Sequence, residues 1–293
     1  MFLPESKVSC LRRTLDALYA SRSPGHLAND PLSFCHRYSR PEDREIAALI
    51  SSVFAYGAVK VIKGSLKRIF AETGDSLSGF IDRFNPELHA VAFDGFRHRF
   101  NDARDLGCLL WAIRIMRERC GSIEQFFADS SKGENMPLDD RINRFCSAVL
   151  ALDYSPVTGS ASLPADSYFR FMFPLPAGGS CCKRLCMFLR WVVRPADGID
   201  LGLWKAVCPS ELFIPVDVHI ARIARHLGLT ARRHPDWKMT REITESLRLL
   251  DPDDPVKYDF PICHLGISEG CDGKAGDACA VCPIAVHCAV CSV

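Results

Sequence analysis

The sequence lacks long apolar runs, a charge excess and internal repeats. No uninterrupted apolar stretch in its 293 residues reaches the ~20 residues that a membrane-spanning helix needs. The first twenty residues mix charged and apolar side chains, unlike a signal peptide. The 36 lysines and arginines balance 35 aspartates and glutamates, which excludes a histone-like polycation but not a local basic face. We therefore expect a cytoplasmic protein without membrane partners.

Signals for β-structure are also missing. No segment sustains period-two alternation between hairpin-type turns. Apolar residues instead recur at helical spacing in stripes that begin at Val8, Ile46 and Leu106. Pro41 opens one such segment and Gly57 closes it, which is typical punctuation for a helix. The sequence therefore predicts an all-α fold.

Cysteine, in contrast, is abundant, with 15 residues. The C-terminal segment has the spacing Cys271-x7-Cys279-x2-Cys282-x5-Cys288, and Cys291 follows three positions later. Thiolates within one short segment can converge on a metal without closing a long loop. Zinc sites most often contain two Cys-x2–4-Cys pairs, and this segment contains one. The unequal gaps favour a [4Fe–4S] cluster, and zinc is the alternative. A third interpretation is that these cysteines are separate reduced thiols that bind no metal.

A Gly- and Pro-rich turn interrupts the helical pattern at residues 173–180, just before a helix that we expect from about Cys181 to Val193. Gly178, Gly179 and Ser180 would let the backbone approach a phosphate, and the N–H groups of the next helix bind anions. The turn therefore either grips a nucleic-acid backbone or merely joins two helices.

Asp217 stands where the next helix should begin, and Gly228 stands where that helix should end. Capping alone would explain this aspartate. Basic residues flank the segment on both sides, which fits either a DNA-facing groove or a solvated helix face. They are Lys183, Arg184, Arg190 and Arg194 after the turn, and Arg222, Arg225, Arg232, Arg233, Lys238 and Arg241 further on.

The order of these motifs resembles that in the endonuclease III and MutY-type helix-hairpin-helix DNA glycosylases. The motifs are the Gly-rich hairpin, Lys183, the segment Val216–His219 and the cysteine loop. In that superfamily a Val-Asp-x-His element supplies the catalytic aspartate, and a Cys-x6-Cys-x2-Cys-x5-Cys loop holds a [4Fe–4S] cluster. Here the first cysteine gap is seven, Cys291 is a spare, and an insertion occupies about Arg194–Pro209.

Over nearly its whole length the chain also resembles an uncharacterised bacterial family, a distant and functionally unassigned branch of the same superfamily. The residues that carry this second resemblance are Asp30-Pro31, Arg37-Tyr38, Pro41–Glu45, Ala55–Gly57, Ser180–Arg184, Leu189–Trp191, Asp251–Pro255 and Lys257–Phe260.

The glycosylase resemblance implies a role for each site residue. Asp217 would stabilise the cationic sugar or accept a proton, and Lys183 would attack C1′ as a neutral amine. Tyr56 lies where the superfamily places a gap-filling side chain, although core packing would also explain it. His219, Arg184 and the hairpin residues Gly178, Gly179 and Ser180 would contact DNA. Cys271, Cys279, Cys282 and Cys288 would hold the [4Fe–4S] cluster.

We therefore expect a two-lobed helix-hairpin-helix glycosylase-like fold. Residues 31–205 would form a helical barrel lobe that ends in the hairpin, and residues 1–30 and 206–293 a cluster lobe. The expected activity is base-excision DNA glycosylase, with or without abasic-site lyase activity, on duplex DNA with a damaged base or abasic site. A non-catalytic nucleic-acid-binding protein and an iron–sulfur redox protein are the alternatives. The protein would be associated with the nucleoid.

Overall fold

The structure is a computed structural model, and it describes residues 5–22, 24–131, 136–267 and 269–291. Helices dominate this part of the chain, so the all-α prediction is confirmed. The α-helices are α1 (Glu5–Ala20), α2 (Pro41–Val53), α3 (Val59–Thr73), α4 (Leu77–Asp82), α5 (Pro86–His89), α6 (Ala103–Cys120), α7 (Ile123–Asp129), α8 (Leu138–Leu150), α9 (Ser155–Thr158), α10 (Lys183–Val193), α11 (Val218–Leu227), α12 (Trp237–Arg248), α13 (Asp259–Ile267) and α14 (Asp277–Ala280).

One short strand pair interrupts the helices. Strands β1 (Arg97–His98) and β2 (Asn101–Asp102) are antiparallel, with His98 opposite Asn101. Two residues per strand are too few for alternation to appear in a sequence pattern, and for this reason our sequence analysis predicted no strand here. Short 3₁₀ turns complete the fold, of which η3 (Tyr168–Met172) and η4 (Pro176–Gly178) flank the site described below.

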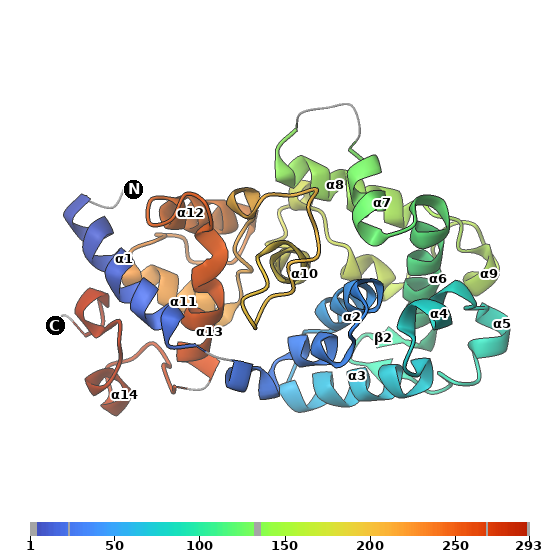
Figure 1. Ribbon diagram of the computed structural model, residues 1–293, viewed down its shortest axis with the longest axis horizontal. Coiled ribbons are helices and arrows are strands. Elements are labelled where there is room, and N and C mark those ends of the chain that lie inside the picture. Colours follow the sequence, from blue (N-terminus) through green and yellow to red (C-terminus); the bar gives the residue numbers. More distant parts are fainter. Residues whose placement is uncertain (1–4, 23, 132–135, 268, 292–293) are drawn as a thin grey trace.

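Helix α10 lies at the centre of the molecule (Figure 1). On one side of it are α1, α11, α12, α13 and α14, and on the other are α2 to α9. The N-terminal helix α1 packs against the C-terminal part, where the Tyr258 hydroxyl donates to Asp16 at 2.8 Å. The division of the chain at residues 30/31 and 205/206 stays a prediction. No helix in the described part is both long and apolar enough to cross a membrane.

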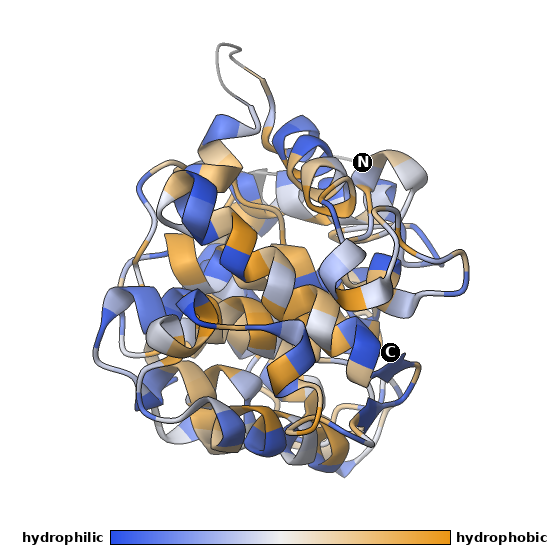
Figure 2. Ribbon diagram, turned by 90° about the vertical axis from the view of Figure 1, so that its right-hand side faces the viewer, coloured by the Kyte–Doolittle hydropathy of each residue, from blue (hydrophilic) through white to orange (hydrophobic). Residues whose placement is uncertain are grey.

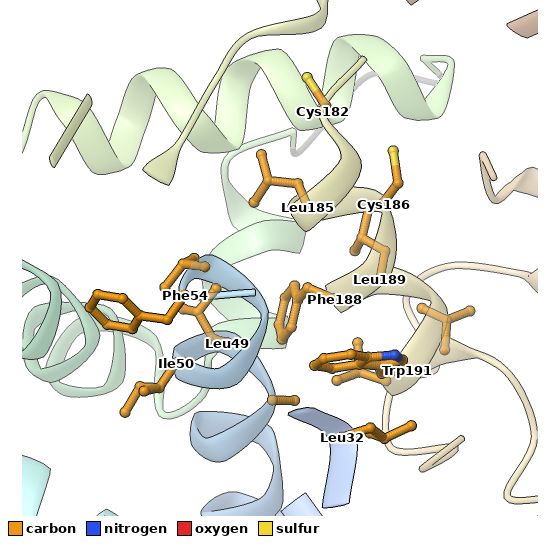
Figure 3. Close-up of a cluster of buried hydrophobic side chains, with 14 of the residues drawn as sticks. Leu32, Leu49, Ile50, Phe54, Cys182, Leu185, Cys186, Phe188, Leu189 and Trp191 are labelled. Atoms are coloured by element: carbon orange, nitrogen blue, oxygen red, sulfur yellow. The ribbon is translucent and has the colours of Figure 1, made fainter. Parts of the chain in front are cut away.

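The core between α10 and α2 is apolar. Leu185, Phe188 and Leu189 of α10 are buried against a cluster that includes Leu49 and Phe54 at the end of α2 (Figure 3). Across the whole molecule the hydrophobic segments gather in the interior and the hydrophilic ones lie outside (Figure 2). Burying a side chain of this size stabilises the fold by about 1.5–3 kcal/mol, and the contact holds the start of α10 in place.

The segment after α10 runs back along that helix without forming a helix of its own. The amides of Leu201 and Leu203 donate to the carbonyls of Trp191 and Val192, each at 2.7 Å. These bonds give partners to carbonyls that the end of a helix leaves unpaired. Trp204 is buried, and its indole N–H donates to Glu45 at 2.8 Å. The expected insertion is thus part of the core.

Two arginines of this region are buried with acidic partners. Arg190 pairs with Asp200 at 3.0 Å and with Asp259, while Arg194 pairs with Asp200 and, at 2.9 Å, with Asp254. The sequence predicts both arginines on a basic surface, either a DNA-facing groove or a solvated helix face. That assignment is wrong, because both guanidinium groups lie inside the protein and are neutralised there.

We predict that Arg190→Met lowers the free energy of unfolding by about 3–5 kcal/mol, since it leaves the carboxylates of Asp200 and Asp259 buried without their shared partner. The measurement is urea denaturation at neutral pH. Arg40→Met serves as a matched control, because Arg40 is exposed and pairs only at the surface with Glu42. That change should cost at most about 1 kcal/mol. Equal losses in the two variants would contradict the role given to Arg190.

Candidate functional site

The hairpin before α10 is a tight turn whose two glycines have open space beside them. Gly179 has a φ of +81°, and added Cβ atoms at Gly178 and Gly179 would meet no protein atom within 4 Å. The carbonyl of Gly179 accepts from the amide of Trp237 at 3.0 Å, which fixes the hairpin to the start of α12. Ser180 accepts from the amide of Cys182, a residue with a φ of +47°. The outer side of the turn is therefore free to approach a ligand backbone.

Lys183 is the first residue of α10 and follows this turn directly. Its Nζ lies 3.5 Å from Oδ2 of Asp217, and about one third of its side chain remains exposed. The predicted lysine and aspartate, which are 34 positions apart in the sequence, are thus brought together. Lys183 is thus a partly exposed lysine with a carboxylate beside its amine.

The two carboxylate oxygens of Asp217 have different partners. Oδ1 accepts from the backbone amides of His219 and Ile220 at 2.9 and 2.8 Å, so Asp217 is the N-cap of α11. Oδ2 is directed at Lys183. The capping role and the candidate catalytic role therefore coexist, because the helix holds one oxygen and leaves the other for chemistry.

Cys263 of α13 is a member of this site that our sequence analysis missed. Its thiol donates to Oδ2 of Asp217 at 3.5 Å. Burial, followed by the nearby Asp217 carboxylate, raises the pKa of this thiol well above its usual value, so the thiol stays protonated and remains a donor. No spacing motif links Cys263 to Asp217, and only the packing of α13 on α11 brings them together.

This arrangement can carry out nucleophilic chemistry. A lysine side chain attacks a carbon atom only as the neutral amine. Attack by Lys183 therefore requires a proton acceptor, and Oδ2 of Asp217 is positioned to be that acceptor. The same oxygen can stabilise a positive charge that develops on a substrate beside the amine.

Two other residues expected to contact DNA, Arg184 and Tyr56, have partners inside the protein. Arg184 is buried and donates to the carbonyls of Val53, at 2.8 Å, and Phe171. Burial lowers the pKa of Arg184 to about 10. The hydroxyl of Tyr56 donates to the His98 carbonyl at 2.9 Å and to Asn101. These positions give no support to direct DNA contacts by the Arg184 guanidinium or by the Tyr56 hydroxyl.

His219 is half-buried and lies against α13. A Cβ at Gly266 would be only 2.3 Å from Nδ1 of His219, so glycine is required there for the close approach of the two helices. Nδ1 also lies 3.2 Å from the guanidinium of Arg222. His219 therefore serves the packing of α11 on α13, and its expected contact with DNA has no support from this position.

All five C-terminal cysteines line one cavity of about 470 Å³. They are Cys271, Cys279, Cys282, Cys288 and the spare Cys291. Apolar residues of α11 and α13, among them Ile223 and Leu265, complete the lining. Within the described ranges, no three His, Cys, Asp or Glu side chains are arranged so that they could hold a metal ion. Thiolates are the ligands that iron–sulfur clusters and zinc take, so the chemistry of these side chains fits such a centre although their arrangement in this structure does not form one.

The cysteine loop is tied to the two helices that also build the site. The amide of Cys271 donates to the Leu265 carbonyl at 3.0 Å, and the guanidinium of Arg222 donates to the Cys271 carbonyl. At Gly273, which has a φ of +85°, a Cβ would lie 2.5 Å from Cδ of Arg222. Anything that fills the cavity would thus stabilise α11 and the C-terminal end of α13.

We predict that Asp217→Ala lowers the free energy of unfolding by about 1 kcal/mol, whereas Asp217→Asn changes it little, because asparagine caps a helix as well as aspartate does. Urea denaturation measures both. Asp236→Ala is the matched control, since Asp236 caps α12 by accepting from the Met239 amide and should show a similar loss. Equal losses of stability in the two Asp217 variants would contradict the prediction that Oδ1 stabilises the protein by capping α11.

One family model matches residues 30–268 of the chain, and its description is a protein of unknown function (DUF2400). No curated protein and no solved structure matches the chain. The matched range contains the hairpin, Lys183, Asp217 and Cys263, and it ends before the cysteine loop. Because the match covers most of the sequence, this protein belongs to the DUF2400 family.

Proposed function

We propose that the protein is a DNA glycosylase of base-excision repair with abasic-site lyase activity. The observation that carries this proposal is the 3.5 Å approach of Lys183 Nζ to Asp217 Oδ2 directly behind an open, glycine-rich hairpin. A partly exposed lysine with a proton acceptor beside its amine suits attack on the sugar carbon C1′. Two glycines with open space around them suit the phosphate backbone on either side of that sugar.

The glycosylase step begins when Lys183 loses a proton to Asp217. The neutral amine then attacks C1′ as the bond from C1′ to the base breaks, and the base leaves with the bonding electrons and takes up the proton that Asp217 had accepted. Asp217 is then a carboxylate again and stabilises the positive charge left on the sugar–lysine adduct. Removing the base from the duplex costs a few kcal/mol in lost stacking, which binding to the protein must offset.

The lyase step proceeds from an abasic site, whose open sugar is an aldehyde. The amine of Lys183 adds to C1′, and loss of water leaves an imine. Removal of a C2′ proton then expels the 3′ phosphate by β-elimination, and water releases the cleaved sugar from the lysine. No oxidant or reductant is consumed, so the residues of the site suffice for the reaction.

Exposed cations around α11 and α12 provide the affinity for DNA in this proposal. They are Arg225, Arg233, Lys238 and Arg241. The amide of Trp237 at the start of α12 bonds to the hairpin carbonyl of Gly179, so Lys238, the next residue, lies near the turn. Contacts of this kind hold any sequence and weaken as salt increases.

We further propose that Cys271, Cys279, Cys282 and Cys288 hold a [4Fe–4S] cluster, with zinc as the alternative. Bound there, the cluster would cross-link the cysteine loop and strengthen its attachment to α11 and α13. Helix α11 begins at Asp217 and α13 contains Cys263, so the loop would help to hold Asp217 beside Lys183.

We predict that sodium borohydride traps the wild-type protein on a DNA duplex with a single abasic site and that Lys183→Ala abolishes the adduct. Asp217→Asn should slow adduct formation by about 100-fold or more, which is a typical contribution of a proton acceptor. Denaturing gel electrophoresis measures the adduct. Lys60→Ala, which changes an exposed lysine of α3, is the matched control and should trap like the wild type.

An adduct that persists in Lys183→Ala would exclude this lysine as the nucleophile. Binding to the duplex without any adduct, together with unchanged affinity in Asp217→Asn, would instead identify a non-catalytic DNA-binding protein.

We predict that protein purified without oxygen contains iron and acid-labile sulfide and that Cys279→Ser removes at least half of both. Elemental and sulfide analysis measures the content independently of activity. Cys10→Ser is the control, because Cys10 is exposed on α1 and outside the cavity. Zinc without sulfide would establish the alternative, and the absence of both metals would refute a metal centre.

A further inference from the structure

Three half-exposed aromatic rings form a patch on the surface, which we name the aromatic patch: Phe100, Tyr168 and Phe171. Their exposed fractions are 49%, 50% and 43%. Phe100 and Tyr168 stack with centroids 5.4 Å apart and an angle of 20° between the ring planes, and Phe171 meets Phe100 edge-on at 6.4 Å. Large apolar side chains grouped in this way on a surface indicate a binding site.

One buried carboxylate fixes the two segments that present these rings. Asp105 accepts from the side chain of Asn101, next to Phe100, at 3.0 Å. The same carboxylate accepts from the Ser167 hydroxyl at 3.0 Å and from the Phe169 amide at 2.9 Å, and these residues flank Tyr168. The patch is therefore held by the interior and needs no ligand to form, which reduces the entropy lost on binding.

The turn between β1 and β2 is strained at the residue before Phe100. Arg99 has a φ of +54°, which is uncommon for a residue other than glycine. Its guanidinium lies 5.5 Å from the centroid of the Phe100 ring. Strained backbone of this kind persists where the surrounding structure requires it, and it is concentrated at functional sites.

The aromatic patch borders the start of α10. The Arg184 guanidinium lies 4.0 Å from the centroid of the Phe171 ring, and Arg184 directly follows Lys183 in the helix. The half-buried ring of Tyr56 supports Phe171 from the protein side, with centroids 5.3 Å apart. Arg184 therefore connects the two sites, because it contacts Phe171 of the aromatic patch and is the neighbour of Lys183 in the chain.

The charge around the patch is mainly positive. Exposed arginines of the two segments are Arg97, Arg99, Arg104 and Arg170, and the exposed acidic residues there are Asp102 and Asp166. The Asp102 carboxylate is engaged as the N-cap of α6. Exposed ring faces among cations are the chemistry by which proteins hold unpaired nucleic-acid bases. An apolar protein surface would find no complement for these cations.

We propose that the aromatic patch stacks unpaired bases of the DNA strand next to the nucleotide at Lys183. This inference rests on the proposed function and adds to it the form of the substrate, namely a strand opened locally around the reacting nucleotide. Stacking on the patch would supply part of the free energy that opening the duplex requires.

The test uses a duplex with one abasic site flanked by the fluorescent base 2-aminopurine, whose emission reports stacking. We expect wild-type protein to change this emission on binding, and Phe100→Ala and Tyr168→Ala to bind about tenfold more weakly with the change lost. Phe100→Tyr keeps a ring and should behave like the wild type. Leu88→Ala, at an exposed apolar residue of α5, is the matched control. Thermal unfolding verifies that each variant is folded.

Borohydride trapping on the same duplex separates the two proposals. Wild-type affinity and emission in both alanine variants, with normal trapping, would overturn the stacking role and leave the proposed function intact. Ring-dependent emission without any adduct would support stacking and overturn the lyase reaction. No binding to the duplex by the wild type would overturn both.

Discussion

The buried ion pairs of Arg190 are the contact on which the rest of the structure depends. This guanidinium bridges α10, the segment that follows it and α13, through Asp200 and Asp259. A buried ion is tolerated only where its partners are present and well oriented, so these pairs constrain how the three segments can be arranged. Residues separated by 69 positions in the sequence are thereby held in contact.

The candidate site follows from that arrangement. Lys183 lies two helical turns before Arg190 on α10, and Cys263 lies one turn after Asp259 on α13. Joining Arg190 to Asp259 therefore also directs Lys183 and Cys263 to the same place. Asp217 reaches that place from α11, which packs on α13, and its carboxylate meets both side chains. The buried ion pairs of Arg190 do not face DNA themselves. They position Lys183 and Asp217, the two residues that we propose to act on DNA.

Local chemistry explains which parts of this site could be anticipated. A glycine-rich turn before a helix and an aspartate at a helix start are short-range signals, and the structure contains both at Gly179 and Asp217. Arg190 and Arg194 were misassigned because a basic residue on a helix gives no local sign of whether its partner is water or a buried carboxylate. Cys263 was missed for a related reason, since its partner is 46 positions away.

The sequence by itself determined the helical class, the position of the hairpin and the N-cap at Asp217, because periodicity, glycine conformation and capping act over a few residues. Only the tertiary structure decided which charges are buried, which thiol reaches Asp217 and which aromatic rings stay at the surface. Those outcomes depend on packing between segments distant in the chain. Asp105, for example, accepts hydrogen bonds both from Asn101 beside the β1–β2 turn and from Phe169 in η3. Desolvation then separates the arginines that form the core from those that remain exposed to a ligand.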